Sequence, residues 1–512
     1  MQEVRTMFRR VQNGSDVRGV VRATAEEAVT FTEGMAFSIA RAFGEWLREQ
    51  TGLSWEELQI GIGYDSRQTA EAFAHAAACG LAGTRTLQCG MVSTPAMFQS
   101  TRLPESDFDG AIMLTASHLP QNRNGMKFFY KEGGLEKGTV AALLERAAEI
   151  AAQLPTDAQG MPLLPEDAEE TAEPFDLLDI YCRHLREEIC REVAAEDYAH
   201  PLAGLHVVED AGNGAAGFFA ARILEPLGAD ISGSVFLEPD GSFPNHVPNP
   251  ENETAMEAIR KATLDAHADL GVIFDCDGDR AAVVFADGTE VNRNTLIALL
   301  SAIVAEEAPG STIVTDSITS DELTVFLEKE LGLKHLRYMR GYKNVIDKGV
   351  ALNAAGERCE LAIETSGHGA FRKNAFSDDG AYICVRILIR MAQLKKEGRR
   401  LEELIAALEE PGEAREIRYA IRGEDFADYA TQVLDDLKTY AAAEPRFRLV
   451  EPNYEGVRIA FDDDEVKGWV LLRKSLHDPV MPMNLESRRP GGVAILLERM
   501  TQFLQSYDRL QG

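Results

Sequence analysis

Apolar and polar positions alternate along most of the chain in two rhythms, which predict strands and helices in turn. Short apolar runs predict buried strands at 59–63, 204–208, 270–274, 281–285 and 312–315. Longer segments with apolar residues at every third or fourth position predict helices at 24–49, 68–81, 215–224, 294–307 and 320–331. This order favours α/β layers with substantially parallel sheets.

The last part of the chain has a different pattern. Residues 446–461 and 468–473 predict strands, and 493–506 predict a closing helix, so we expect a smaller α+β domain at the C-terminus. Two stretches rich in proline and charge, 153–174 and 409–415, predict linkers. The chain has 512 residues, which exceeds one hydrophobic core and predicts three or four domains.

Charge and composition narrow the class of protein. The net charge of −31 argues against a nucleic-acid-binding protein, because phosphate backbones require a basic stripe. A local cluster of Arg and Lys can still bind a small anion, since salt screens the global field within about 8 Å. The seven cysteines form no Cys-x-x-Cys pair, and the basic N-terminus is followed by no signal-like apolar stretch. We therefore expect a reduced, cytoplasmic protein without a membrane anchor.

The sharpest constellation is DCDGDR at 275–280, between two predicted strands. An extended backbone would direct Asp275, Asp277 and Asp279 to one side, and three crowded carboxylates need a cation. Carboxylate oxygens suit Mg²⁺. An EF-hand is excluded, because Arg280 stands at its sixth position and Ala286 at its twelfth.

A solvated acidic turn is the alternative, but the flanking apolar strands make it the weaker interpretation of DCDGDR. Arg280 beside the aspartates offers a guanidinium fork for a phosphate.

Residues 209–217, EDAGNGAAG, fit G-x-G-x-x-G with Gly212, Gly214 and Gly217. This pattern alone would suggest a dinucleotide-binding dehydrogenase. However, Glu209 and Asp210 stand where a pyrophosphate would approach. A glycine-rich turn after a strand is the better interpretation.

Residues 115–125, TASHLPQNRNG, place Ser117 and His118 side by side in a turn between two strand-like runs. Adjacency alone does not make a hydrolase dyad, and the chain has no G-x-S-x-G elbow. A surface turn is the plain alternative. A serine that carries a phosphoryl group would supply the anionic oxygen that a three-carboxylate metal site lacks.

Together these motifs resemble the α-D-phosphohexomutase superfamily, over nearly the whole chain and in family order. TASHLP resembles the phosphoserine loop, DCDGDR the metal loop, ETSGH at 364–368 the sugar-recognition loop, and RKSLHDP at 473–479 the phosphate-binding loop. SDVRG at 15–19, GYDSR at 63–67 and HVPNPENE at 246–253 are further matches.

The resemblance implies a fold of three similar α/β domains with mixed sheets and a smaller C-terminal α+β domain around a central cleft. The implied domains are 1–175 with the phosphoserine loop, 176–291 with the metal loop, 292–410 with the sugar-recognition loops and 411–512 with the phosphate-binding loop.

The resemblance also implies roles for individual residues. The catalytic group would be Ser117, His118, Lys127 and Arg18, and the metal ligands Ser117, Asp275, Asp277 and Asp279. The substrate would contact Arg67, Arg280, Gly341, Tyr342, Lys343, Glu364, Ser366, His368, Arg473, Ser475 and His477. Arginine is a poor base because its pKa lies above about 12, so Lys127 is the better acid/base candidate.

The implied activity is Mg²⁺-dependent interconversion of hexose 1-phosphate and hexose 6-phosphate, of mannose or glucose or both. It would proceed through a phosphoserine enzyme and a hexose 1,6-bisphosphate, which also serves as activator. The partners would be small sugar phosphates, with no nucleic acid or membrane, and the protein a monomer or homodimer. A phosphoglucosamine mutase, a phosphatase and a non-catalytic sugar-phosphate-binding protein are the alternatives.

Some positions depart from the family pattern. Leu119 stands where most members have Asn, and Leu476, His477 and Asp478 stand where Asn, Thr and an acid are usual. Residues 340–343, RGYK, lie in the loop that reads sugar orientation and match no subfamily closely. The segment 153–174 resembles an insertion.

Overall fold

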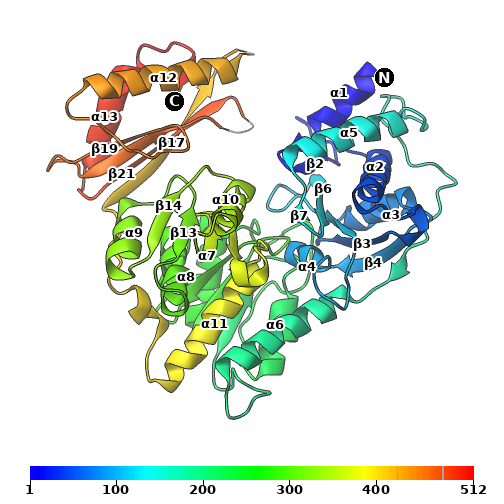
Figure 1. Cartoon of the computed structure of the whole chain (residues 1–512), viewed down its shortest axis with the longest axis horizontal. Helices are drawn as coiled ribbons and strands as arrows, with labels where there is room; N and C mark the ends of the chain where they lie inside the picture. Colours follow the sequence, from blue (N-terminus) through cyan, green and yellow to red (C-terminus); the bar gives the residue numbers. More distant parts are fainter. Residues whose placement is uncertain (424, 476–477) are drawn as a thin grey trace. The chain divides into compact units, whose positions relative to one another are not determined.

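The computed structural model describes residues 1–423, 425–475 and 478–512. They form two compact units, which Figure 1 colours by position along the chain. The first unit comprises Met1–Asn292, Ser366–Gly369 and Ser377–Arg400. The second comprises Arg293–Thr365, Ala370–Phe376 and Leu401–Gly512.

The first unit begins with a mixed sheet of strand order β1-β2-β6-β5-β3-β4-β8, with β7 paired to β6. β4 and β5 run parallel to β3, whereas β6 runs antiparallel to β5 and β2. The strands are β1 Gln12–Asn13, β2 Asp16–Val20, β3 Gln59–Tyr64, β4 Arg85–Met91, β5 Gly110–Leu114, β6 Arg123–Tyr130, β7 Gly133–Gly134 and β8 Glu173–Pro174.

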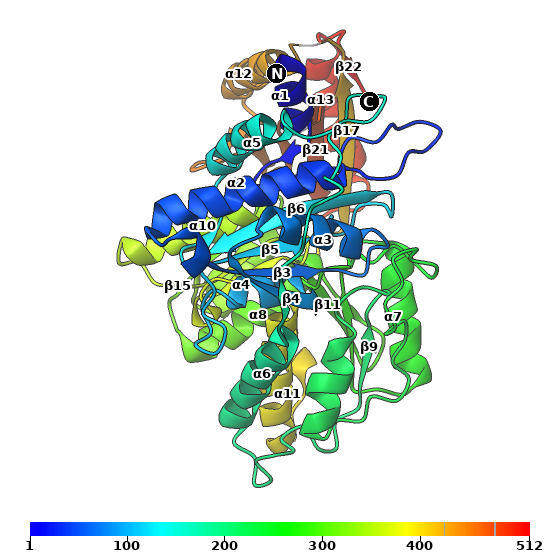
Figure 2. The same cartoon turned by 90° about the vertical axis from the view of Figure 1, so that its right-hand side faces the viewer.

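Helices cover this sheet on both faces (Figure 2). α2, α3 and α5 share a core with one face of β3, β5 and β6. α4 lies against the other face, where Met97 fills the space above Gly61 and Gly63. The helices of this part are α1 Gln2–Arg10, α2 Glu33–Thr51, α3 Ala70–Gly80, α4 Thr94–Gln99 and α5 Lys137–Ala151.

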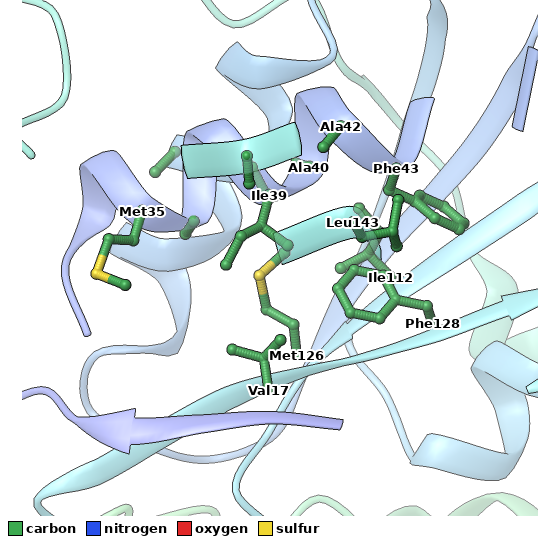
Figure 3. Packing of buried hydrophobic residues seen from close by; sticks show 14 of the residues in the cluster. Val17, Met35, Ile39, Ala40, Ala42, Phe43, Ile112, Met126, Phe128 and Leu143 are labelled. Carbon is green, nitrogen blue, oxygen red and sulfur yellow. The ribbon is translucent and has the colours of Figure 1, made fainter. Parts of the chain in front are cut away.

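The core between α2, α5 and the sheet is made of aliphatic and aromatic side chains (Figure 3). Ile39 and Phe43 of α2 face Ile112, Met126 and Phe128 of the strands. Burying each such side chain contributes about 1.5–3 kcal/mol. This packing anchors β5 and β6, the two strands that carry the loop of Ser117 between them.

The second sheet of the first unit has the order β12-β11-β10-β9. β9 pairs parallel with β10, and β10 forms an antiparallel pair with β11. The elements are β9 Val207–Asp210, β10 Leu270–Phe274, β11 Ala281–Phe285, β12 Glu290–Val291, α6 Leu177–Val193, α7 Glu253–Asp265 and α11 Gly380–Lys396.

Helix α11 comes from far along the chain and packs against α6 and β11. Tyr181 Oη donates to Asp379 at 2.7 Å, and Tyr382 Oη donates to Glu188 at 2.6 Å. Arg386 pairs with Glu192 at 2.6 Å. These buried contacts hold residues 377–400 in the first unit.

The second unit contains the remaining two sheets. One has the order β14-β13-β15-β16, with β13 parallel to β14 and β15, and the other is antiparallel with the order β18-β19-β20-β21-β17-β22. The strands are β13 Thr312–Thr315, β14 Lys334–Arg337, β15 Cys359–Ile363, β16 Gly369–Phe371, β17 Glu413–Ile421, β18 Arg448–Leu449, β19 Val457–Phe461, β20 Gly468–Leu472, β21 Val480–Ser487 and β22 Leu510–Gln511. The helices are α8 Arg293–Glu307, α9 Asp321–Val325, α10 Tyr342–Ala354, α12 Phe426–Ala443 and α13 Gly492–Leu504.

Most strand predictions are confirmed, whereas several boundaries are wrong. The helix predicted at 24–49 begins only at Glu33, because Thr32 caps it by accepting from Met35 N–H at 3.4 Å. The helix predicted at 215–224 shrinks to a π-helical turn, Ala220–Leu224. The strand predicted at 446–461 is two short strands, and the predicted linker 409–415 already contains the start of β17.

The proline-rich segment 153–174 packs against the start of α2. Thr32 Oγ1 donates to the carbonyl of Pro162 at 2.7 Å. A Cβ atom on Gly34 would lie 2.5 Å from that same oxygen. The segment is therefore part of the packed surface of the first unit. In the part of the chain that the structure describes, no helix is long and apolar enough to cross a membrane.

Glu486 of β21 is a buried carboxyl group beside a cavity of about 270 Å³ in the second unit. It shares a hydrogen bond with Glu322 of α9 and accepts one from Trp469 Nε1 at 2.7 Å. Burial and the charge of Glu322 raise the pKa of Glu486 to about 8. An unfolded chain releases this proton near pH 4.3.

We therefore expect a pH-dependent stability term from Glu486. The folded state keeps the proton, so this stabilisation is complete below about pH 4.3 and is lost progressively up to about pH 8. Between pH 5 and 8 the Tm of Glu486→Gln should fall less than that of the wild type. Glu498→Gln on the exposed surface of α13 is the matched control. Equal slopes for the wild type and Glu486→Gln would contradict the prediction.

Candidate active site

The loop between β5 and β6 presents Ser117 in an uncommon backbone conformation. Ser117 is buried and has a φ of 50°, in the left-handed region that non-glycine residues rarely adopt. Its N–H donates to Thr115 Oγ1 at 2.8 Å. Arg67 donates to the carbonyl oxygens of Ser117 and of Leu119, the latter at 2.6 Å.

The loop between β10 and β11 gathers three carboxylates. β10 and β11 pair up to Phe274 and Ala281, so the six intervening residues form a tight turn. One oxygen from each of Asp275, Asp277 and Asp279 lies within 4.8 Å of the others. The predicted acidic cluster therefore exists, and all three side chains are buried.

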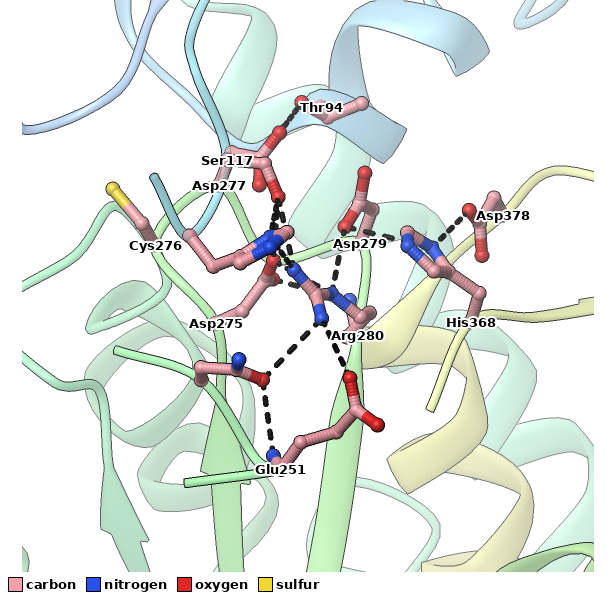
Figure 4. Close-up of polar contacts among 12 residues, drawn as sticks. Thr94, Ser117, Glu251, Asp275, Cys276, Asp277, Asp279, Arg280, His368 and Asp378 are labelled. Atoms are coloured by element: carbon pink, nitrogen blue, oxygen red, sulfur yellow. Dashed lines mark hydrogen bonds and ion pairs between the residues drawn. The ribbon is translucent and has the colours of Figure 1, made fainter. Parts of the chain in front are cut away.

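The two loops meet at the hydroxyl of Ser117 (Figure 4). Ser117 Oγ donates to Asp275 at 3.2 Å and accepts from Arg280 Nη2 at 3.1 Å. His118 Nδ1 lies 3.2 Å from the same hydroxyl and also contacts Arg280. Arg280 Nε in turn donates to Asp275 at 3.1 Å. The serine hydroxyl is thus held between the carboxyl group of Asp275 and the guanidinium of Arg280.

Thr94 and Lys127 bind the other two carboxylates. Thr94 Oγ1 donates to Asp277 at 2.6 Å, and Thr94 N–H donates to the carbonyl of Asp277 at 2.8 Å. Lys127 Nζ pairs with Asp279 and lies 3.3 Å from Asp277. These contacts fix the direction of both carboxylates.

Burial and nearby charges shift the pKa values of Asp275 and Asp279 in opposite directions. Burial and the charges of Asp279 and Asp277 hold the pKa of Asp275 well above its usual range. Burial also disfavours the charged form of Asp279, but Lys127 and His368 hold its pKa below the usual range. Burial and the charge of Arg280 lower the pKa of His118 to about 2, so this ring is neutral at neutral pH.

The acidic loop fits a hard divalent cation. Oδ1 of Asp277 and Oδ1 of Asp279 are buried without a hydrogen-bond partner in the described residues. Such orphaned carboxylate oxygens are costly unless a cation binds them. Mg²⁺ prefers oxygen ligands of this kind. The three aspartates could therefore hold a metal ion.

His368 approaches the acidic loop from a distant part of the chain. Its Nδ1 lies 2.5 Å from Asp378 and 3.7 Å from Asp279. Although burial disfavours its charged form, Asp378 and Asp279 raise the pKa of His368 to about 9. Residues 368 and 280 also form a backbone bridge. A charged imidazole thus joins the site of the first unit.

The second unit holds several of the other predicted substrate residues. Glu364 accepts from Gly341 N–H at 2.7 Å, so the two predicted sugar loops meet. Arg473 is buried, and its Nε has no hydrogen-bond partner among the described residues. Asp478 N–H donates to Ser475 Oγ at 3.2 Å.

Three family models match the chain in sequence order. They are domains I, II and III of phosphoglucomutase/phosphomannomutase, each described as alpha/beta/alpha, and they match residues 9–153, 179–288 and 292–411. The chain belongs to the phosphoglucomutase/phosphomannomutase family. It is therefore an isomerase of the phosphohexomutase type, within the α-D-phosphohexomutase superfamily.

Individual relatives agree with this assignment. The chain is 29% identical to the phosphomannomutase/phosphoglucomutase of Pseudomonas putida over 92% of this chain and 90% of the relative. It is 30% identical to the phosphomannomutase of Salmonella montevideo, covering 92% and 94%. The crystal structure of a phosphoglucomutase/phosphomannomutase family protein from Burkholderia thailandensis matches with a TM-score of 0.76, 26% identity and coverage of 98% and 97%.

The expected phosphohexomutase fold is confirmed: three α/β domains with mixed sheets precede a C-terminal domain of sheet and helices. The domain limits and the roles of the individual site residues stay predictions. Within the first unit the structure gathers Ser117, His118, Lys127, Arg280 and His368 at the three aspartates.

Other predicted residues differ in their surroundings. Arg18 of β2 pairs with Asp16 at 2.9 Å, and its charge acts on the pKa of His118 and of Asp277. Lys343 pairs with Asp347 at 3.1 Å on α10, which begins at Tyr342. Ser366 is buried in the first unit. His477 and Leu476 lie outside the described residues.

Sequence reasoning missed Thr94 and Asp378, and no motif marks either of them. Thr94 follows Ser93 at the start of a short helix, and Asp378 stands in the run SDDG. Of the glycines of EDAGNGAAG, Gly214 packs closely against the acidic loop. A Cβ atom on Gly214 would lie 2.6 Å from the carbonyl oxygen of Cys276.

Proposed function

We propose that this phosphohexomutase interconverts hexose 1-phosphate and hexose 6-phosphate through a phosphorylated Ser117. The observation that carries the proposal is the place of Ser117 Oγ, between the Asp275 carboxylate and the Arg280 guanidinium. Relatives named phosphomannomutase/phosphoglucomutase support mannose and glucose phosphates as substrates.

The proposed reaction is two successive phosphoryl transfers. In the first, the bond between phosphorus and Ser117 Oγ breaks, a bond between phosphorus and the oxygen of the free sugar hydroxyl forms, and the hydroxyl proton is passed to Ser117 Oγ. The product is a hexose 1,6-bisphosphate. In the second, the other phosphoryl group returns to Ser117, which regenerates the enzyme. Such transfers need mainly positioning and charge neutralisation.

Arg280 and Lys127 supply positive charge to this site. Arg280 Nη2 faces Ser117 Oγ, where its fork can bind phosphoryl oxygens. Lys127 pairs with Asp279 and Asp277. We propose Lys127 as the group that moves the proton of the sugar hydroxyl, with Arg18 contributing charge. His118 is neutral at neutral pH, and its Nδ1 lies 3.2 Å from Ser117 Oγ.

We propose Mg²⁺ as the resident cation, held by Asp275, Asp277, Asp279 and a phosphoryl oxygen on Ser117. A bound Mg²⁺ would supply charge neutralisation to the transferring group. Lys127 and Thr94 would keep the carboxylates of Asp279 and Asp277 in place.

Apart from Ser366, which belongs to the first unit, the proposed contacts to the sugar and to the phosphate that is not transferred come from the second unit. We propose that Glu364 and Ser366 bind sugar hydroxyls, with Gly341, Tyr342 and Lys343 at the ring. Arg473 and Ser475 would bind the phosphate that is not transferred. The buried Arg473 guanidinium, whose Nε is unpartnered among the described residues, supports this role.

We expect Arg473→Gln to raise KM by about 10- to 100-fold, because one charged hydrogen bond contributes about 1.5–3 kcal/mol. kcat should change by less than about 3-fold, since Arg473 would bind the phosphate equally in the ground state and in the transition state. Steady-state kinetics with glucose 1-phosphate measure both constants. The exposed Arg415→Gln on β17 is the control. An unchanged KM for Arg473→Gln would remove Arg473 from the phosphate site.

Two measurements test the proposed function. Intact-mass analysis before and after incubation with glucose 1,6-bisphosphate should show one added phosphoryl group. A coupled assay with glucose 1-phosphate, mannose 1-phosphate and glucosamine 1-phosphate then reports the preferred sugar. Saturable binding without turnover of any of the three would favour a binding protein. Phosphate release without isomer formation would favour a phosphatase. A monomer or homodimer in the cytoplasm stays a prediction.

A further inference from the structure

Asp65 is a buried carboxylate at the end of β3 that no step of the proposed reaction uses. Its side chain has no exposed surface. It accepts hydrogen bonds from Thr115 Oγ1 at 2.7 Å and from Arg67 N–H at 3.0 Å. Arg67 Nε lies 3.2 Å from it as an ion pair. Two groups that contact Asp65, the hydroxyl of Thr115 and the guanidinium of Arg67, also contact the loop that carries Ser117.

The first group is the hydroxyl of Thr115. It donates its proton to Asp65 and accepts the N–H of Ser117 at 2.8 Å. The acceptor Asp65 fixes the rotation of this hydroxyl, so that a lone pair points at Ser117. The peptide group that precedes the Cα of Ser117 is thereby held.

The second group is the guanidinium of Arg67. Its Nη2 donates to the carbonyls of Ser117 and of Leu119, the latter at 2.6 Å. Its Nη1 donates to the carbonyls of Pro120 at 2.8 Å and Arg123 at 3.0 Å. The side chain is fully buried. Nη1 and Nη2 each serve two backbone carbonyls, and Nε lies against Asp65, so these contacts favour a role inside the protein over the predicted substrate contact.

The two groups act on the two peptide planes that flank Ser117, which together set its φ and ψ. Ser117 needs such restraint, because a left-handed φ of 50° costs a non-glycine residue of order 1 kcal/mol or more. If the torsions relaxed, Oγ would move away from Asp275 and Arg280.

Asp65 also touches the acidic loop. Cys276 Sγ, between two of the clustered aspartates, lies 3.5 Å from the Asp65 carboxylate. The backbone at Gly241 packs directly against Arg67, since a Cβ atom on Gly241 would lie 2.7 Å from Arg67 Cα. One carboxylate thus has contacts with both loops that meet at the hydroxyl.

We propose that Asp65 is a positioning residue which, through Thr115 and Arg67, fixes the backbone of Ser117 and so places its Oγ against Asp275 and Arg280. The proposal rests on the proposed function, in which Ser117 carries the phosphoryl group. It explains why a loop with Leu119 in place of Asn keeps its shape. Arg67 binds the backbone carbonyl of Leu119, and this contact does not depend on the side chain at that position.

The test compares Thr115→Val with Thr115→Ser in the full chain. Thr115→Val removes the hydroxyl, and kcat should fall by about 10²-fold while KM changes by less than about 2-fold, because misplacement of a reacting atom by about 1 Å has this effect. Thr115→Ser restores the hydroxyl and should recover most of kcat. Thr101→Val is the matched control, since Thr101 is an equally buried threonine of the same sheet domain whose hydroxyl donates to the Phe98 carbonyl.

A second variant keeps the proposal falsifiable if Thr115→Val does not fold. Arg67→Lys retains the charge but cannot serve four carbonyls at once, so kcat should fall by a similar factor. In the double variant Thr115→Val with Arg67→Lys the loss should stay close to that of the larger single variant, because release of either peptide plane already displaces Ser117 Oγ. Multiplicative losses, or failure of Thr115→Ser to recover kcat, would overturn the proposal.

The rate of phosphoryl transfer from glucose 1,6-bisphosphate to Ser117, followed by intact mass, gives a second readout. It should slow in Thr115→Val and recover in Thr115→Ser. A wild-type protein that never gains the phosphoryl group would refute the proposed function itself. A wild-type protein that gains it at the same rate as Thr115→Val would refute only the positioning role.

Discussion

Replacing Ser117 by alanine is expected to lower kcat by roughly 10⁴-fold or more, the scale seen when a covalent catalytic group is removed. Ser117 Oγ is the hydroxyl that lies 3.2 Å from Asp275 and 3.1 Å from Arg280, and alanine leaves no oxygen there. The loop should keep its place, because Thr115 and Arg67 bind the backbone of residue 117. A coupled assay with glucose 1-phosphate measures the loss.

The control for this variant is Ser100→Ala, another buried serine of the same sheet domain. Its hydroxyl donates to the Met97 carbonyl at 2.7 Å, so it tests the cost of losing a buried hydroxyl alone. Circular dichroism and thermal unfolding should show a folded protein in both variants. Turnover of Ser117→Ala near the wild-type rate would end the assignment of Ser117 as phosphoryl carrier.

Removal of divalent cations is expected to have the second largest effect. EDTA should lower kcat by roughly 10³-fold or more, and Mg²⁺ should restore it, because the charge of the transferring group would otherwise lack its main partner. The structural basis is that Oδ1 of Asp277 and Oδ1 of Asp279 are buried and have no hydrogen-bond partner within the part of the chain that the structure describes. Metal-independent turnover would contradict the assignment of the acidic loop.

A binding measurement locates the cation independently of activity. Mn²⁺ binding, followed by electron paramagnetic resonance, should weaken at least about 10-fold in Asp277→Asn, because loss of one charged ligand contact costs more than about 1.4 kcal/mol. Asp287→Asn, in the exposed turn after β11, should bind Mn²⁺ like the wild type. Equal weakening in both variants would point to a nonspecific effect of charge.

The predicted strands at 270–274 and 281–285 match β10 and β11 residue for residue. Each is a short run of apolar residues, and such a run becomes buried as a central strand of a sheet. The acidic loop between them was predictable for the same reason, because the strands bring its ends together.

Boundaries that depend on capping were harder to predict. The apolar residues of 24–49 have helical spacing, yet the helix begins only after the N-cap residue Thr32. Residues 30 and 31 bond instead to the carbonyl of Val20. The helix predicted at 215–224 lost its first half, where Gly217 packs against the backbone of Leu237. Local periodicity carries no information about such contacts.

The sequence by itself determined which chemical groups are present, namely a serine loop and an acidic loop in the order typical of the family. Only the tertiary structure decided which groups share one site. Thr94 reaches Asp277 across 183 positions, and α11 brings His368 and Asp378 to the first unit through its contacts with α6. Arg67, predicted to contact substrate, donates to two carbonyl oxygens of the serine loop. The physical reason is that periodicity and motifs report local preference, whereas a buried hydrogen bond between distant segments exists only after both have packed.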